Sequence, residues 1–222
     1  MTVRPLLPLV LASAILAAAP FSALAQAPAA KSAAATTQGE SPSKLVLDNS
    51  QRVLSTLESR RAEFSADRGK LQAFITSEFD QMFDRDYSAR QVLGRHGRGA
   101  SDADVKVFAD ALAESLMRRY GSSLLDFNTQ LRARVKSETP LPRGLGVKVS
   151  SEMLRSGGEP IPVDYLMRKT ADGWRVFDVM VEGVSFVQTF RQQFDTPLSR
   201  KSIRAVAADL SAGRVQADAG TN

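Results

Sequence analysis

The chain of 222 residues is long enough for one domain with a sizeable core, and its hydrophobic content of 43% is ordinary for a globular protein. It has no cysteine, which excludes disulfides, zinc thiolate sites and thiol catalysis. Its one histidine, His96, has no second imidazole to assist it, which argues against a Ser-His-Asp or metal-histidine cluster. The formal net charge of +5 permits attraction to anionic membranes or nucleic acid but demonstrates neither.

The N-terminal residues have the features of an export signal. Arg4 supplies a positive charge, residues 6–24 form an apolar run, and an Ala-Leu-Ala sequence ending at Ala25 has the small-x-small form of a cleavage site. We therefore expect a signal peptide over residues 1–25, cut before Gln26. Its small-residue end and Pro20 argue against a retained membrane helix, and no other long apolar run occurs.

Composition also sets the expected domain boundaries. Residues 26–42 are rich in Ala, Ser, Thr and Pro and have almost no large apolar side chain, so they predict a flexible leader. A folded domain is expected over residues 43–212. The polar residues 213–222 predict a disordered tail.

Four helices are predicted in the first half of this domain, because apolar residues recur there at helical spacing. The stripes run over Lys44–Leu57, Asp67–Phe83, Tyr87–Leu93 and, after a Ser101 cap, Val105–Tyr120. Between the third and the fourth lies the basic, glycine-rich sequence 94–99. It matches neither a P-loop nor a dinucleotide fingerprint, so we interpret it as a helix–helix loop rather than a phosphate cradle.

Strands are predicted next, because apolar and polar residues alternate with a period of two. The four segments are Phe127–Ser137, Leu145–Arg155, Ile161–Lys169 and Trp174–Val181, with a two-residue hairpin turn at Gly157-Gly158 and a turn at 171–173. They predict an antiparallel four-stranded meander with one apolar and one basic face. The fourth segment is apolar on both sides, which is typical of a strand covered on both faces; alternation places Phe177 and Val179 opposite Val176 and Asp178.

A turn and a helix follow that fourth strand. Glu182-Gly183 interrupts the strand, and Ser185 lies three residues before Gln188, the spacing of a capping box. The helix that it opens carries aromatic residues at helical spacing and is expected to stop before Pro197. Ser199 is then expected to cap a last helix over residues 203–210.

The sequence WRVFDVMVEGVSFVQTFRQQF, residues 174–194, resembles the signature of the MlaC family of periplasmic phospholipid-binding, or toluene-tolerance, proteins. The features that carry the resemblance are an aromatic-led strand ending in Asp178-Val179, the turn Glu182-Gly183-Val184-Ser185, and a helix ending in Arg191-Gln192-Gln193-Phe194. The resemblance implies an α+β fold, with helices and an antiparallel sheet wrapped around an apolar pocket for phospholipid acyl chains.

The resemblance also implies a function and partners. The chain would be a periplasmic, monomeric carrier, not an enzyme, that needs no cofactor and holds phospholipid as cargo. It would exchange lipid between an outer-membrane lipoprotein complex and the MCE-domain ring of an inner-membrane ABC transporter, and so maintain outer-membrane lipid asymmetry. The predicted lipid-binding residues come from inward apolar faces: Phe83, Leu112, Leu116, Val149, Tyr165, Met167, Phe177, Val179, Val184 and Phe190.

Two other functions compete with the carrier. An exported enzyme on a similar fold would use Asp178 as an acid or a base, since Asp178 with Glu182, like Asp84 with Asp86, is a carboxylate pair. An adaptor without a pocket would dock a partner on its basic strand face, where Arg132, Arg134 and Lys136 lie. Nucleic-acid binding is disfavoured, because no aromatic residues interleave with those cations.

Overall fold

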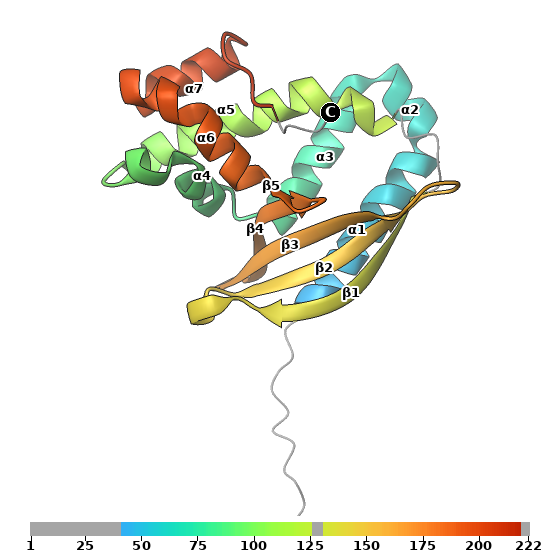
Figure 1. Cartoon of the computed structure of the whole chain (residues 1–222). Coiled ribbons are helices and arrows are strands. Elements are labelled where there is room, and N and C mark those ends of the chain that lie inside the picture. Colours follow the sequence, from blue (N-terminus) through green and yellow to red (C-terminus); the bar gives the residue numbers. More distant parts are fainter. Residues whose placement is uncertain (1–40, 126–130, 219–222) are drawn as a thin grey trace, which may run out of the picture. The chain divides into compact units, whose positions relative to one another are not determined.

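The computed structural model of the chain describes residues 41–125 and 131–218, which belong to one compact unit (Figure 1). The first half of the unit is helical. It contains α1 (Pro42–Ser59), α2 (Arg61–Ala66), α3 (Arg68–Met82), α4 (Arg85–Leu93), the 3₁₀ turn η1 (Gly94–Gly97), α5 (Asp102–Tyr120) and the 3₁₀ turn η2 (Ser122–Leu125).

The sheet comes next, and two helices close the chain. The elements are β1 (Arg132–Pro140), the 3₁₀ turn η3 (Pro142–Gly144), β2 (Val147–Leu154), β3 (Ile161–Thr170), β4 (Gly173–Val181), β5 (Val184–Ser185), α6 (Phe186–Arg200) and α7 (Ile203–Ser211). The strands follow one another in the order β1-β2-β3-β4-β5, and each neighbouring pair is antiparallel. The predicted α+β class and antiparallel meander are therefore confirmed.

Side-chain caps fix where the helices begin, largely where the sequence predicts. The Ser101 hydroxyl accepts the Asp104 N–H (3.1 Å) at the start of α5, and the Ser185 hydroxyl accepts the Gln188 N–H (3.0 Å) at the start of α6. Asp67 accepts two N–H groups at the start of α3 in the same way. The predicted helix starts at Asp67, Ser101 and Ser185 thus follow from the satisfaction of free backbone donors.

The sheet has a fifth strand that the sequence did not predict. Glu182 and Gly183 have φ values of 50° and 83°, the left-handed pair that a two-residue hairpin turn needs. Their turn folds Val184-Ser185 back beside Met180-Val181. Only two residues pair here, too few for a period of two to be visible in the sequence.

A β-bulge in β4 corrects the predicted alternation. Met167 of β3 faces Val176, and Tyr165 faces Val179, so β4 has one more residue than β3 between these pairs, Phe177. Val176 and Val179 therefore lie on the same face of the sheet, contrary to the expectation. Phe177 instead meets the ring of Tyr87 on α4 edge to face, with centroids 5.4 Å apart.

Three loop and helix boundaries also differ from the prediction. The connection after β2 runs from residue 155 to residue 160, so Gly157-Gly158 is not a two-residue hairpin turn. Helix α6 continues through Pro197 to Arg200, and Ser202, not Ser199, caps α7 by accepting the Ala205 N–H (3.3 Å). Proline removes one backbone donor, and the packing of Leu198, which is buried, holds the last turn of α6 in place.

The ends of two predicted segments shift as well. The first strand was expected from Phe127; residues 126–130 lie outside the described residues, and β1 begins at Arg132. Residues 213–218, expected in a disordered tail, are packed: Ala217 is fully buried and its N–H donates to the Ser115 hydroxyl (3.4 Å). Arg119 reaches the same segment through Gln216 and Asp218.

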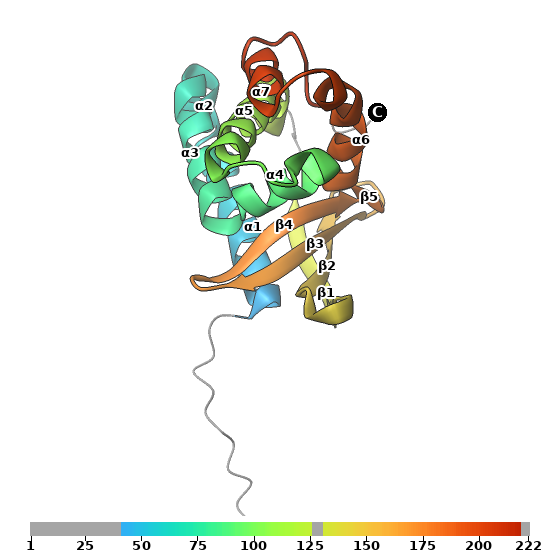
Figure 2. The ribbon, with the colours of Figure 1, turned by 90° about the vertical axis from the view of Figure 1, so that its left-hand side faces the viewer.

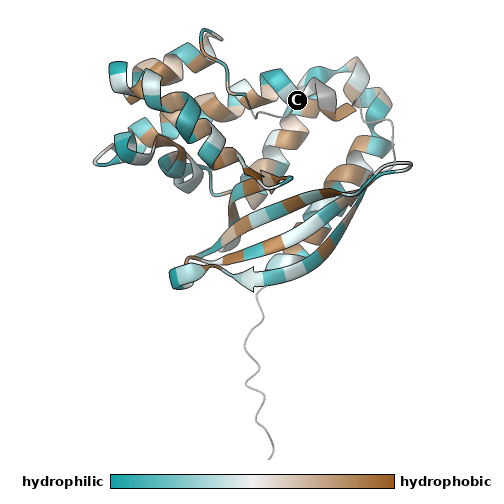
Figure 3. Cartoon of the chain, in the orientation of Figure 1, coloured by the Kyte–Doolittle hydropathy of each residue, from teal (hydrophilic) through white to brown (hydrophobic). Residues whose placement is uncertain are grey.

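Different helices cover the two faces of the sheet. Helix α1 packs on β1 and β2, whereas α4 and α6 pack on β4, as Figure 2 shows from a second side. Hydropathy alternates along the long strands in Figure 3, as the period of two predicted. Glu152 lies on the polar face of β2 and binds Arg134 (2.7 Å) and Lys136 (2.6 Å) of β1.

Three buried apolar clusters hold these layers together. The first joins α4 to α7, where Phe108 and Phe194 meet edge to face with centroids 5.5 Å apart. The second lies between the sheet and α1, and Val46 and Met167 in it are completely buried. The third joins α1, α2, α3 and η2 around Phe64. Burial of these side chains, at about 25 cal/mol per Å² of apolar surface, is the main stabilising term.

Candidate functional site

The corner between β4 and α6 is built around one buried carboxylate. Asp178 is 7% exposed, and its two oxygens accept the Ser185 hydroxyl (2.5 Å) and the Val187 N–H (3.0 Å). Burial raises the pKa of Asp178 above its ordinary value, and these hydrogen bonds partly oppose that shift. Both oxygens are thus engaged in anchoring the helix, which is the opposite of an acid or base poised toward a substrate.

The ten residues predicted to bind lipid do not form one group. Five of them, Phe83, Val149, Tyr165, Met167 and Val179, lie in the cluster between the sheet and α1. Within that group Val149 and Met167 are completely buried, whereas Tyr165 is half-buried and reaches α1, where it hydrogen-bonds Ser50. Burial raises the pKa of the Tyr165 phenol, and the hydrogen bond to Ser50 acts in the opposite direction.

The other five predicted residues lie elsewhere. Leu112, Leu116 and Phe190 belong to the cluster that joins α4 to α7. Phe177 contacts Tyr87, and Val184 at the β4–β5 turn is 50% exposed. The structure therefore brings together Phe83, Val149, Tyr165, Met167 and Val179, and separates them from the members on α5 and α6.

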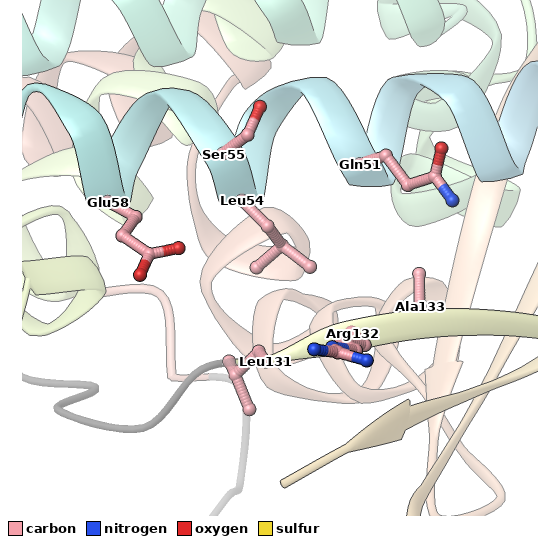
Figure 4. Close-up of a pocket in the computed structure, with 7 residues that line it drawn as sticks. All are labelled: Gln51, Leu54, Ser55, Glu58, Leu131, Arg132 and Ala133. Carbon is pink, nitrogen blue, oxygen red and sulfur yellow. The ribbon is translucent and has the colours of Figure 1, made fainter.

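A cavity of about 410 Å³ lies between α1 and the first residues of β1 (Figure 4). Leu54 and Glu58 point from α1 toward β1 in this view. The residues that line it mix apolar, neutral polar and charged side chains: Gln51, Leu54, Ser55, Glu58, Leu131, Arg132 and Ala133. A volume of this size falls within the range of roughly 300–1,000 Å³ that is usual for small-molecule sites.

A second cavity of about 190 Å³ adjoins the first at Arg132, which lines both. Its other lining residues, Leu154, Arg155 and Ser156, come from the end of β2 and the loop that follows. Arg132 and Leu154 face each other across the β1–β2 pair. The side chains of Arg132 and Leu154 therefore share the polar face of the sheet with Arg134 and Glu152.

None of the lining residues was among the ten predicted lipid-binding residues. Leu54, Glu58 and the start of β1 carry no sequence motif, and their proximity arises only when α1 packs on the edge strand. Leu54 belongs to the apolar stripe predicted over Lys44–Leu57, but such a stripe does not distinguish a side chain that lines a cavity from one in the core.

The basic loop after α4 is paired within the chain. His96 Nε2 lies 3.0 Å from Asp195 Oδ1 on α6, and Arg95 donates to the other oxygen of Asp195 (2.7 Å). These contacts hold the pKa of Asp195 below its ordinary value. The loop thus joins α4 to α6, as expected for a helix–helix connection.

The described residues contain neither a metal site nor a membrane-spanning helix. Within residues 41–125 and 131–218 no group of three or more His, Asp or Glu side chains is arranged to hold a metal ion. In this described part of the chain, no helix has the length and apolarity needed to cross a bilayer.

These features define an α+β domain in which an antiparallel meander is packed against α1 on one face and against helices at its β4 end. Comparison with known proteins gives the same class. Residues 47–212 match the model of the MlaC protein family, and the chain belongs to this family.

Two known proteins illustrate the similarity. The chain is 22% identical over 192 residues to the toluene tolerance protein ttg2D of Pseudomonas putida, covering 82% of this chain and 87% of that protein. Its fold is similar to that of a phospholipid-binding protein from Ralstonia solanacearum, solved in complex with a phospholipid. The TM-score is 0.67 at 20% identity, over 77% of this chain and 94% of that one.

Proposed function

We propose that this chain is an exported, periplasmic carrier that binds phospholipid by its acyl chains. The observation that carries the proposal is the match of residues 47–212 to the MlaC family, together with the similar fold of a protein that was solved with a phospholipid bound. The export signal expected over residues 1–25 supports the location. Phospholipid is the cargo, and no cofactor is required.

The energetics of lipid transfer fit a carrier. Each buried methylene is worth about 0.8 kcal/mol relative to water. Exposing two acyl chains to water would therefore cost on the order of 20 kcal/mol, so a lipid needs a carrier protein to cross between membranes. Transfer from a bilayer into an apolar protein interior is nearly neutral, because one apolar environment replaces another. Such a carrier loads and unloads without hydrolysing anything.

The cavity beside α1 accommodates part of an acyl chain in this proposal. Leu54 and Ala133 are among the residues that line its 410 Å³. A lipid with two chains would need further space, and the apolar cluster around Val149 and Met167 lies on the sheet face that α1 covers. We therefore keep the ten predicted residues as candidate lipid contacts.

The finer steps belong to the same proposal. As a monomer, the carrier would exchange lipid with an outer-membrane lipoprotein complex and with the MCE-domain ring of an inner-membrane ABC transporter, and so help to keep phospholipid out of the outer leaflet. The structural role of Asp178 supports a carrier over an enzyme, because both of its oxygens are hydrogen-bonded to the start of α6.

The test is native mass spectrometry of the mature protein, purified from the periplasm without detergent, followed by organic extraction of whatever co-purifies. A stoichiometric adduct that extracts as phospholipid would support the carrier and would count the acyl chains. A measured mass equal to that of the protein alone, with no lipid gained on incubation with liposomes, would contradict the carrier function.

A further inference from the structure

One face of β1 and β2 gathers positive charge. The strand register and the side-chain contacts place four cations on it: Arg132, Arg134 and Lys136 of β1 and Lys148 of β2. Helix α1 packs on the opposite face of these two strands, and no helix of the described residues crosses in front of them in Figure 1. We call this surface, which is open to solvent, the basic face.

The charges of the basic face are layered, with the cations outside. Glu152 binds Arg134 (2.7 Å) and Lys136 (2.6 Å); its side chain is 11% exposed, whereas theirs are 59% and 56% exposed. Lys148 and Asp164 repeat this arrangement at 3.5 Å, with the lysine the more exposed of the two. Lys136 and Arg134 hold the pKa of Glu152 below its ordinary value, so the carboxylate stays ionised beneath them. An approaching surface therefore meets positive charge first.

Two arginines lie at one end of the basic face. Arg132 and Arg155 line the 190 Å³ cavity together with Leu154 and Ser156. Arg155 Nε donates to the Glu159 carbonyl oxygen (3.1 Å), which holds this side chain against the β2–β3 loop. Arg132 is exposed, and within the described residues it makes no hydrogen bond or ion pair. Its guanidinium is therefore available to an anion outside the chain, such as a phosphate group.

The residue types on this side of the sheet favour a membrane over a protein as the partner. Among the positions of β1, β2 and β3 that point to this side, none is aromatic, whereas the centres of protein interfaces are enriched in Trp and Tyr. A bilayer requires no shape-matched pocket, because its headgroups are mobile. It attracts clusters of Lys and Arg when it contains anionic lipids.

We propose that the basic face docks this protein on the surface of a bilayer that contains anionic phospholipids. Each cation close to such a surface strengthens binding by about fivefold while salt does not screen it. Arg132 contributes its full charge. Arg134 and Lys136 contribute in part, because the single carboxylate of Glu152 compensates only one of their two charges.

This inference adds to the proposed carrier function, since a protein that exchanges lipid has to reside for a time at a bilayer. The two can fail separately. Adhesion to a vesicle surface is measured by sedimentation, whereas lipid held inside the protein is measured by extraction after the vesicles are removed. A protein that holds lipid but adheres to no vesicle would refute the docking face alone, and one that adheres but never holds lipid would refute the carrier alone.

The experiment sediments the full mature protein with vesicles of phosphatidylcholine alone and with vesicles of equal phosphatidylcholine and phosphatidylglycerol content. We expect strong adhesion to the anionic vesicles only. This adhesion should decline between low and physiological salt, because salt screens exposed charges. Equal adhesion to both kinds of vesicle, or adhesion that salt leaves unchanged, would overturn the proposal.

Two single substitutions on the basic face should act in opposite directions. Arg132→Gln removes an exposed cation, so it should leave the fold intact and weaken partition onto anionic vesicles about fivefold. Glu152→Gln removes the carboxylate beneath Arg134 and Lys136 and should strengthen partition by a similar factor. Circular-dichroism melts check that both variants fold. If Arg132→Gln adheres as well as the wild type, or a folded Glu152→Gln adheres no better, the basic face is not the docking surface.

Matched controls remove a positive charge elsewhere. Arg98 follows η1 and Arg200 ends α6, and both are exposed. Arg98→Gln and Arg200→Gln lower the net charge as much as Arg132→Gln does, but they should leave adhesion unchanged. If they weaken it equally, net charge rather than the basic face drives adhesion, and the proposal is wrong.

An acidic protein partner is tested with polyglutamate as the probe. Polyglutamate is added to the wild type and to Arg132→Gln in place of the vesicles. We expect anionic vesicles to bind the wild type in preference to polyglutamate at equal concentrations of negative charge. Binding of polyglutamate that depends on Arg132, without adhesion to vesicles, would assign the basic face to an acidic protein and would overturn the membrane proposal.

Discussion

The hydroxyl of Ser185 donates a 2.5 Å hydrogen bond to the carboxylate of Asp178 and at the same time accepts the Gln188 N–H at 3.0 Å. One side chain thus caps α6 and ties it to β4. The other oxygen of Asp178 accepts the Val187 N–H, so β4 and the first turn of α6 are held as one unit. The sequence that resembles the family signature thus forms the junction between a strand and a helix.

Asp178→Asn tests whether the Asp178 carboxylate has a structural or a catalytic role. The amide retains one acceptor but turns an N–H₂ group toward a partner that donates, so one buried hydrogen bond is lost at a cost of about 1–2 kcal/mol. We expect the free energy of unfolding, measured by urea denaturation, to fall by about that amount while lipid uptake per folded molecule stays unchanged. Abolished lipid uptake in a folded variant would contradict a purely structural role.

The pH dependence of this corner has a defined sign. Burial raises the pKa of Asp178 in the folded protein, so between the unfolded and folded pKa values the folded state binds more protons than the unfolded state. The stability that Asp178 contributes is therefore full below the unfolded pKa and declines as the pH rises through the folded pKa. The stability difference between wild type and Asp178→Asn should shrink as the pH rises through that window. If the stability difference instead grows as the pH rises between the two pKa values, the pKa of Asp178 is not raised in the folded protein.

The turn between β4 and β5 offers a test of backbone strain. Glu182 has a φ of 50°, where an asparagine is more easily accommodated, and Gly183 has a φ of 83°. We expect Glu182→Asn to raise the free energy of unfolding by roughly 0.5–1 kcal/mol and Gly183→Ala to lower it by about 1–2 kcal/mol. Thermal and urea denaturation of the two variants measure both effects. Equal stability of all three proteins would show that the hairpin turn contributes nothing to folding.

The sheet face under α1 is tested by enlarging a side chain. Val149 is fully buried there, and Val149→Trp adds volume that a packed core accommodates at a cost of about 1–3 kcal/mol. If acyl chains enter this layer, the indole should displace them and reduce the bound lipid measured by extraction. Phe64→Ala, in the cluster that joins α1, α2, α3 and η2 and holds none of the ten predicted residues, is the control: it should cost about 3–5 kcal/mol without changing lipid per folded molecule. If Val149→Trp binds as much lipid as the wild type, the acyl chains do not occupy the layer between the sheet and α1.

Much of the fold could be predicted from the sequence, because periodicity reports which face of an element is apolar. The strands of the meander and the capped starts of α5 and α6 followed from patterns of a few residues. The short β5 could not be predicted, since two paired residues have no period. The bulge at Phe177 was hidden for a related reason: one inserted residue reverses the alternation, and the strand is apolar on both sides.

The candidate site depends on how the elements pack, which the sequence reports less directly than the fold. Periodicity shows that Leu112 and Val149 are buried, but it says nothing about which element covers each of them. Their assignment to one pocket stays a prediction, and the structure places them in separate clusters. The cavity at Arg132 depends on the meeting of α1 and an edge strand that are far apart in the sequence, so no local pattern could have revealed it.

The bulge in β4 serves an aromatic contact rather than the register of the strand. Trp174 and Val176 meet the sheet face under α1 on one side of Phe177, and Asp178 meets α6 on the other. Because Phe177 is the residue in excess, a strand without it would still place Val176 opposite Met167 and Asp178 opposite Leu166. Only the edge-to-face contact between Phe177 and Tyr87, which joins β4 to α4, would be lost. We therefore expect a related chain that lacks this aromatic pair to tolerate a strand that is one residue shorter here.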